Sequence, residues 1–399
     1  MKTDIAIVGG GMVGATLACA LRNSQLDVVM IDPGAAKAPA SSTRFDLRVS
    51  AITRASQRVF EQLHVWPAML EEGVSPFREM HVWEQSGRGE MHFDSAELSE
   101  PYLGHIIENR VILSALYDRL REDSNVTLLT EQHVQHMALD HEGWQLTLSD
   151  GEQIDATLVV GADGSRSWVR QQAGISVKGW DYDQRAVVTY VKTSLPHQET
   201  AWQRFLPAGP LAFLPLLDGY SSIVWSTSPQ HADQLLAMDD TAFGDALSSA
   251  YEGRLGEIED VGPRAAFPLR FLVAEHYVGE HLALIGDAAH TIHPLAGQGV
   301  NLGILDAASL AQVLMTAHGQ HQTMGSHSVL RKYERWRKAE NMDMLVMVDQ
   351  IQRWFGIQDG PIPWLRNLGL SVIDHSGPLK NVIIEHAMGN RGDLPHIAR

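Results

Sequence analysis

The sequence has almost no cysteine and no long uncharged apolar run. Cys19 is the single cysteine among 399 residues, which excludes an intramolecular disulfide, a dithiol redox site and a multi-cysteine zinc or iron–sulfur centre. No stretch reaches the roughly 18 uncharged apolar residues of a membrane-spanning helix. The N-terminus lacks the apolar core and cleavage site of a secretory signal. We therefore expect a cytoplasmic protein, with peripheral contact at the inner face of the membrane as a further interpretation.

Positive charge is also scarce. Lys and Arg number 31 against 48 Asp and Glu, which gives a formal net charge of −17. Such a balance argues against non-specific nucleic-acid binding, because that binding needs basic patches to replace the phosphate counterions. Hydrophobic residues make up 44% and charged residues 20% of the chain, as in ordinary folded proteins. We expect a folded protein that does not bind nucleic acid.

The first 32 residues read as strand, turn, helix and strand. An apolar run over 5–8 leads into Gly9-x-Gly11-x-x-Gly14, and Asp32 ends the second apolar run. In such a turn, glycines allow a pyrophosphate to approach the backbone and a helix to pack closely on the strand, and the helix N-terminus attracts negative charge. Asp32 would accept a hydrogen bond from a ribose hydroxyl. The pattern predicts dinucleotide binding; a plain glycine turn in an α/β core is the alternative.

Two further motifs follow predicted strands. One is Val160-Gly161-Ala162-Asp163-Gly164, and the other is Gly286-Asp287-Ala288-Ala289-His290. After the second, Gly297-Gln298-Gly299 opens a helix predicted over about 299–316. Asp287 at a strand end can accept hydrogen bonds from polyol hydroxyls, and the two glycines let the backbone approach a flat ring. The positive end of the helix dipole would stabilise negative charge on that ring. The alternative is an N-capped helix after a loop.

The three motifs, in this order over residues 9–301, resemble the FAD-dependent aromatic hydroxylases, the group of para-hydroxybenzoate hydroxylase. The segments 286–303, 48–52 and 103–109 are similar to the ubiquinone-biosynthesis branch of that family. Within the branch, 202–216 most resembles the hydroxylases of 2-octaprenyl-3-methyl-6-methoxy-1,4-benzoquinol. The hydroxylases of polyprenylphenol come next.

The resemblance implies an activity. FAD would be bound tightly but not covalently, reduced by NAD(P)H, and oxidised by O2 to a C4a-hydroperoxide that hydroxylates a prenylated phenol or benzoquinol. It also implies partners, namely a quinone-biosynthesis protein complex and the membrane surface. Alternatives stay open: a sibling hydroxylase acting at another ring position, a FAD-retaining non-catalytic subunit, or a flavin oxidase reduced by its own substrate.

The motifs and the resemblance together give a set of cofactor-binding residues. Asn109 stands where the family often has Arg or Gln, and Val134 would offer its backbone to the adenine. Arg48 corresponds to an arginine near flavin and nicotinamide, with an ordinary ion pair as the alternative. The complete set is Gly9, Gly11, Met12, Val13, Gly14, Asp32, Arg48, Asn109, Val134, Asp163, Asp287, Pro294, Gly297, Gln298, Gly299 and Asn301.

Two histidines are the candidates for catalysis. His290 and His293 flank the flavin-side loop, and imidazole titrates near neutrality, as proton transfer requires. We favour the alternative that each is a loop histidine hydrogen-bonded to backbone. Neither is expected to bind metal, because His-x-x-His without a carboxylate or thiol partner is a weak ligand set. We predict no metal site.

The pattern of predicted elements indicates an α/β protein. A Rossmann-like FAD-binding domain would be assembled from 1–75, 101–180 and 276–340, with a sheet-rich substrate domain inserted from 76–100 and 181–275. A helical segment over 341–399 completes the chain. It carries an apolar stripe, which is either the core face of an amphipathic helix or a surface for a prenyl tail or membrane: Met342, Met344, Leu345, Met347, Val348, Ile351, Trp354 and Phe355.

Overall fold

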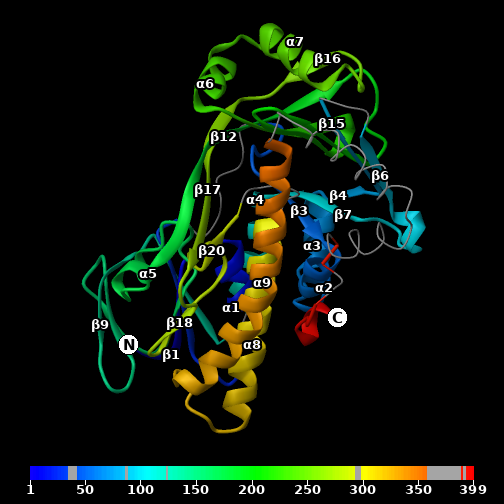
Figure 1. The fold of residues 1–399 in the computed structure, drawn as a ribbon. Helices are drawn as coiled ribbons and strands as arrows, with labels where there is room; N and C mark the ends of the chain where they lie inside the picture. The colour runs from blue at the N-terminus through cyan, green and yellow to red at the C-terminus, as the bar shows by residue number, and fades with distance from the viewer. Residues whose placement is uncertain (35–42, 86–88, 123–124, 293–297, 357–387, 390–391) are drawn as a thin grey trace.

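The computed structural model describes residues 1–34, 43–85, 89–122, 125–292, 298–356, 388–389 and 392–399. Two large sheets form the frame, one at each end of the molecule, and a long helix runs between them (Figure 1). The fold is the mixed α/β arrangement that the motifs predict. The predicted domain boundaries stay a prediction.

The first sheet contains the N-terminal motif. Its order is β18-β19-β11-β1-β2-β8, and β10 and β9 continue it from β11. β1 pairs in parallel with both β2 and β11. The strands are β1 (Lys2–Val8), β2 (Val28–Asp32), β8 (Val126–Thr130), β9 (Val134–Leu139), β10 (Trp144–Leu148), β11 (Gln153–Gly161), β18 (Val278–Gly279) and β19 (Leu282–Leu284). Because β1, β2, β11 and β19 are parallel, the motifs that follow them meet at one edge of the sheet.

The second sheet has the order β20-β17-β12-β15-β14-β13-β5-β6, with β16 paired to β12. Its strands are β5 (Glu79–Glu84), β6 (Glu90–Asp94), β12 (Val177–Thr193), β13 (Thr200–Leu206), β14 (Gly209–Pro215), β15 (Tyr220–Thr227), β16 (Ile258–Val261), β17 (Ala265–Ala274) and β20 (His290–Thr291). A third, small sheet contains β3 (Val49–Thr53), β7 (Gly104–Glu108) and β4 (Ser75–Phe77).

Residues of the second sheet alternate between two faces. Ile223 and Trp225 pack with Phe213, Phe243 and Tyr251 under the outer helices. The intervening side chains of β15 point the other way, toward the first sheet. The outer helices are α6 (Pro229–Ala237) and α7 (Asp240–Tyr251). One face of this sheet is therefore a hydrophobic core, and the other is available to a ligand.

The remaining helices cover the first sheet and the small sheet. They are α1 (Met12–Leu21), α2 (Arg54–Gln62), α3 (Trp66–Glu72), α4 (Asn109–Arg121), α5 (Trp168–Gln172), α8 (Gln298–Gly319) and α9 (His327–Gly356). Short 3-10 turns occur at Ser95–Leu98, Leu217–Gly219, Gly286–Ala288 and His396–Ala398.

Much of the predicted C-terminal helical segment lies outside the described residues. Within the stripe, Met344 and Leu345 are buried, as a core face requires.

Among the described residues, one helix is apolar and long enough to span a membrane, although Asp306 interrupts its apolar run. It is the part of α8 over Gly299–Gly319, and 72% of its most apolar window is buried inside the protein. It packs against α1 and α9 and carries the buried carboxylate of Asp306. These contacts identify α8 as a core helix.

Asp306 is the centre of a buried polar cluster. Its Oδ1 accepts hydrogen bonds from Arg337 Nε at 2.9 Å and Asn341 Nδ2 at 3.0 Å on α9. Its Oδ2 lies 2.5 Å from His290 Nε2 and accepts from Gly286 N at 3.1 Å. Burial alone would raise the pKa of Asp306, but attraction to His290 and Arg337 and their hydrogen bonds hold it below its ordinary value. The cluster joins α8, α9 and the Gly286 turn.

Replacing Arg337 with Met should destabilise the fold strongly. The variant leaves a fully buried carboxylate with one cationic partner fewer, and breaking a buried pair costs about 3–5 kcal/mol in the free energy of unfolding. Chemical denaturation followed by circular dichroism measures the loss. Arg335→Met is the matched control, because Arg335 is exposed on the same helix and its replacement should cost less than about 0.5 kcal/mol. Equal losses in the two variants would contradict the role of the cluster.

Candidate functional site

The glycine turn after β1 has no room for a side chain at three of its four glycines and open space at the other. A Cβ on Gly14 would lie 1.9 Å from Gly9 O, and one on Gly9 would lie 2.4 Å from Ala162 O. A Cβ on Gly10 would lie 2.2 Å from the Tyr117 hydroxyl. At Gly11, by contrast, an added Cβ meets no atom within 4 Å. The first three positions need glycine for packing, and Gly11 keeps a space clear.

Asp32 secures the same turn. Its Oδ2 accepts from Gly10 N at 2.6 Å, and its Oδ1 accepts from Gly34 N at 2.7 Å. Tyr117 on α4 donates to Gly10 O at 3.0 Å. An ionised carboxylate can accept about four hydrogen bonds, so Asp32 keeps capacity for a ligand hydroxyl. Gly10 and Tyr117 were not among the predicted site residues. The run of three glycines could have indicated Gly10, whereas no sequence pattern around Tyr117 indicates its contact with the turn.

Most of the predicted residues that the structure describes line two adjoining cavities. The larger, of about 1060 Å³, is lined by Gly9, Gly11, Met12, Asp32, Arg48, Asn109, Val134, Asp163 and Asp287. The smaller, of about 400 Å³, is lined by Gly11, Met12, Val13, Arg48, Asn109, Asp287 and Gly299. Strand ends far apart in the sequence therefore contribute to one continuous site.

The smaller cavity lies between the two sheets. Ala186, Val188, Phe267 and Leu269 of the second sheet form one wall, and Val300 at the start of α8 lies on another. Aliphatic and aromatic walls suit a flat apolar ring. Since α8 begins at Gln298, the positive end of its dipole lies at this cavity.

Arg48 and Asn109 lie where the cavities meet. Among the described residues, no carboxylate lies within 4 Å of the Arg48 guanidinium, which stands 5.7 Å from the centre of the Phe267 ring. Asn109, the first residue of α4, donates its backbone N–H to Arg48 O at 2.9 Å, and its Oδ1 accepts from Ser50 Oγ at 2.7 Å. The junction therefore holds a guanidinium that forms no ion pair within 4 Å in the described part of the chain, although the carboxylate of Asp287 lines the same junction and attracts it.

Asp287 and Asp163 supply acceptors on the cavity walls. The Asp287 side chain is accessible from the cavities, but protein atoms surround it closely. This partial burial raises its pKa, although attraction to His290 and Arg48 acts in the opposite direction. Oδ2 of Asp163 accepts from Val169 N at 3.0 Å. Its Oδ1 is buried with no hydrogen-bond partner in the described part of the chain. Carboxylate acceptors suit the hydroxyls of a ligand, the Arg48 guanidinium suits its negative charge, and open backbone at Gly11 allows close approach. Together these features suit a polyhydroxylated, anionic ligand with a flat ring.

Several predicted residues lie elsewhere. Asn301 lines neither cavity: its Oδ1 accepts from Thr53 N at 3.0 Å, and its Nδ2 donates to Ala51 O at 2.7 Å, so it braces β3. Gly14 contributes packing. His290 is buried and bound to Asp306 rather than to backbone, and it also lines neither cavity. His293, Pro294 and Gly297 lie outside the described residues, as does the side chain of Gln298.

Comparison with known proteins agrees with this geometry. Residues 2–347 match a family described as an FAD binding domain. The chain is 38% identical to the ubiquinone hydroxylase UbiL of Rhodospirillum rubrum, over 97% of this chain and 89% of that protein. It is also 38% identical to the 3-demethoxyubiquinol 3-hydroxylase of Escherichia coli, over 97% of this chain and 98% of that protein. The crystal structure of p-nitrophenol 4-monooxygenase PnpA from Pseudomonas putida has the same fold, with a TM-score of 0.78 at 18% identity, covering 97% of this chain and 98% of that one.

Gly11→Ala should uncouple FAD binding from folding. The residue has φ −66° and ψ 179°, which alanine adopts freely, but it is also the N-cap of α1, where alanine is less favourable than glycine. These effects oppose each other, so the free energy of unfolding should change by less than about 1 kcal/mol. The added methyl group fills the space that a pyrophosphate would enter, so FAD affinity should fall at least about tenfold, or about 1.4 kcal/mol. Flavin fluorescence titration measures the affinity. Gly319→Ala, equally open but at the far end of α8, should bind FAD normally. Normal FAD affinity in Gly11→Ala would contradict the placement.

Asp287→Ala should lower flavin occupancy. Loss of a charged acceptor costs about 1.5–3 kcal/mol, which corresponds to about tenfold to hundredfold weaker FAD binding. The ratio of flavin to protein absorbance in purified material reports the occupancy. Asp245→Ala, on the exposed face of α7, is the control and should retain full colour. Full occupancy in Asp287→Ala would remove this residue from the site.

Proposed function

The chain belongs to the FAD-binding family of monooxygenases that includes the hydroxylases of ubiquinone biosynthesis, and from this premise we propose that it hydroxylates the ring of a prenylated phenol or benzoquinol in that pathway. It is an FAD-dependent enzyme, and NAD(P)H and O2 are the co-substrates typical of its family. Within the pathway, we propose a benzoquinol of the 2-octaprenyl-3-methyl-6-methoxy type as its substrate, and a polyprenylphenol as the second candidate.

The observation that carries the proposal is the junction of the two cavities. Seven residues line both, so a ring held at the end of the larger cavity reaches the smaller one: Gly11, Met12, Arg48, Asn109, Ala162, Gly164 and Asp287. The apolar wall of the second sheet faces this junction. A second aromatic ring placed there would contact the cofactor's ring and little water.

The residues at the junction have separable tasks. Gly11 and Gly164 leave room for backbone contact with the cofactor, since an added Cβ at either meets nothing within 4 Å. Asp287 at the junction, and Asp32 elsewhere in the larger cavity, would accept hydrogen bonds from its hydroxyls. Arg48 and the N-terminus of α8 would supply positive charge to a flavin bound in the smaller cavity, which would favour its negatively charged reduced form.

FAD supplies the chemistry of oxygen activation when bound. The chain's own contribution is orientation and exclusion of water. Val188, Phe267 and Leu269 surround the smaller cavity with apolar surface, which strengthens the electrostatic interactions inside it. The two ionisable side chains of its described lining are Arg48 and Asp287. We assign no catalytic acid or base, because His290 is committed to Asp306.

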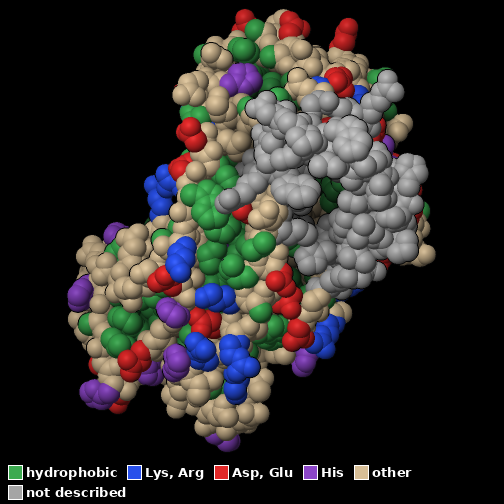
Figure 2. Space-filling model, in the orientation of Figure 1, with side chains coloured by type: hydrophobic (Ala, Val, Ile, Leu, Met, Phe, Trp, Pro, Cys, Tyr) green, Lys and Arg blue, Asp and Glu red, His purple; other side chains and the backbone are tan. Residues whose placement is uncertain are grey.

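A prenylated substrate partitions into membrane, so we propose a cytoplasmic protein that contacts the inner face of the membrane and other proteins of quinone biosynthesis. Figure 2 shows Lys and Arg side chains gathered at the lower end of one face, where α8 and α9 lie in Figure 1. Arg331, Arg335 and Lys338 of α9 line a surface hollow of about 410 Å³ together with His276 and one acid, Glu334, which pairs with Arg331 at 3.2 Å. Such a cluster suits an anionic membrane surface. Arg337 is not part of it, because it is buried.

Anaerobic flavin reduction and oxygen labelling test the proposed function. NADPH or NADH should bleach the bound flavin, faster with substrate present. Under labelled O2, a short-chain prenyl quinol should gain one oxygen label. Flavin bleached by substrate alone and not by NAD(P)H would indicate an oxidase. Bound FAD without turnover, under conditions in which the Escherichia coli relative is active, would indicate a non-catalytic subunit.

The ring position needs a different measurement. Mass spectrometry of the quinone intermediate that accumulates after deletion of the gene would distinguish the candidate substrates. Accumulation of a benzoquinol lacking one hydroxyl supports the first assignment. Accumulation of a polyprenylphenol supports the sibling activity at another position.

A further inference from the structure

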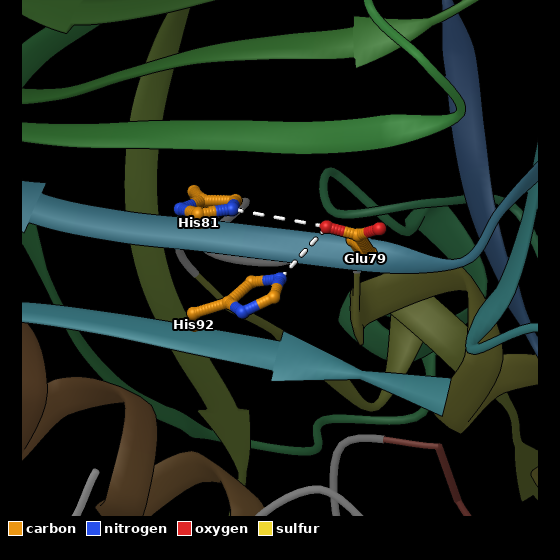
Figure 3. Close-up of side chains that lie close together, drawn as sticks. All are labelled: Glu79, His81 and His92. Atoms are coloured by element: carbon orange, nitrogen blue, oxygen red, sulfur yellow. Dashed lines mark hydrogen bonds and ion pairs between the residues drawn. The ribbon is translucent and has the colours of Figure 1, made fainter. Parts of the chain in front are cut away.

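Two histidines and a glutamate converge on the outer face of the second sheet. Glu79 Oε2 lies 2.8 Å from His92 Nε2 and 3.8 Å from His81 Nε2. The three ligand atoms lie within 4.8 Å of one another, and all three side chains are half-buried. Figure 3 shows Glu79 and His81 extending from β5 and His92 from β6, with the carboxylate beside both imidazoles.

Strand register brings these residues together. β5 and β6 are antiparallel, and His81 stands directly opposite His92. Glu79 precedes His81 by two positions and therefore points to the same face of the sheet. The imidazoles stack with ring centres 4.1 Å apart, and Trp202 stacks against His81 at 4.5 Å. The group is thus held by regular sheet geometry.

A second layer of contacts orients His81. Its Nδ1 lies 3.3 Å from Glu90 Oε1, and Glu90 is in turn paired with Arg254 at 2.8 Å. A carboxylate can only accept a hydrogen bond, so the contact with Glu90 favours the tautomer with its hydrogen on Nδ1. The lone pair is then on Nε2, which lies 3.8 Å from Glu79 Oε2, beyond hydrogen-bond distance. No hydrogen-bond donor to that lone pair occurs in the described ranges. A carboxylate behind a histidine in this way is a typical support for a metal ligand.

The sequence analysis predicts no metal site, but strand register brings three possible ligands together. We propose that Glu79, His81 and His92 bind one divalent transition-metal ion, with zinc as the best match. Two imidazole nitrogens and one carboxylate oxygen are ligands that Zn²⁺ prefers, and three protein ligands leave a fourth position for water. Cobalt, nickel and copper share this preference for nitrogen ligands, whereas Mg²⁺ and Ca²⁺ need more oxygen atoms. Binding replaces the direct contact between Glu79 and His92.

The position in the fold indicates a structural role. β6 is the last strand of the sheet, and the ion would cross-link it to β5 at this edge. His81 pairs across the sheet with Trp202, and Trp202 pairs with Phe213 of the outer core. The smaller cavity lies on the opposite face, where Ser222 and Val224 line it. The ion would therefore not contact substrate or flavin.

Zinc binding to the FAD-loaded full-length protein tests the proposal. After treatment with a chelator, the protein is titrated with Zn²⁺ against a chromophoric chelator, and its thermal midpoint is recorded with and without the ion. The wild type should bind one equivalent and melt at a higher temperature with zinc. His81→Gln and His92→Gln should lose at least tenfold in affinity and lose the thermal shift. His136→Gln, an exposed strand histidine on β9, should behave like the wild type.

Glu90→Gln gives a second test that leaves all three ligands in place. Loss of this supporting carboxylate should weaken zinc binding about tenfold to hundredfold, while the flavin spectrum stays unchanged. The proposal is wrong if the wild type binds no stoichiometric zinc, cobalt, nickel or copper. It is also wrong if His81→Gln and His92→Gln bind as much ion as His136→Gln. Neither result bears on the hydroxylase activity, which is measured separately.

Discussion

The site depends on the close backbone contact at the carboxyl edge of the first sheet. Gly14 on α1 packs against Gly9 at the end of β1, and Gly9 packs against Ala162 after β11, with no room for a side chain at either glycine. This contact brings the start of α1 to the ends of two parallel strands. The larger cavity opens beside it, and at Gly11, which lines this cavity, an added Cβ would meet no atom within 4 Å.

A second constraint is the buried charge of Asp306. A carboxylate without exposure to water must be neutralised by partners, and here the partners come from α9 and from the turn that carries Asp287. Its bond to Gly286 N ties the position of that turn to the packing of the two long helices. The polar cluster therefore positions the cavity wall at Asp287 without lining either cavity. His290 belongs to this cluster, so it stabilises the fold although it directly follows the Gly286-Asp287 motif in the sequence.

Much of the site could be predicted because its residues lie in local patterns. The apolar runs before Gly9 and Gly286 became buried parallel strands, and Asp32 ends β2 as the fingerprint requires. Other features depend on contacts between distant segments. The position of Asn301 in its motif predicted a contact with the cofactor. In the structure, its side-chain amide forms hydrogen bonds with the backbone of Thr53 and Ala51 in β3 instead. Tyr117 and Asp306 carry no local signal, since their partners lie 107 and 16 or more residues away.

The sequence by itself determined the α/β class and the dinucleotide turn, because strand and helix periodicity and glycine spacing are short-range properties. The family, and cavity residues such as Arg48, Asn109 and Val134, followed from the resemblance of the motifs to known hydroxylases. Tertiary structure alone decided that Arg48 and Asp287 stand at the junction of two cavities and that His290 is bound to Asp306. It also decided that Glu79, His81 and His92 share one face. Those relations depend on strand register and helix packing, which bring together side chains whose separation in the sequence carries no information about distance.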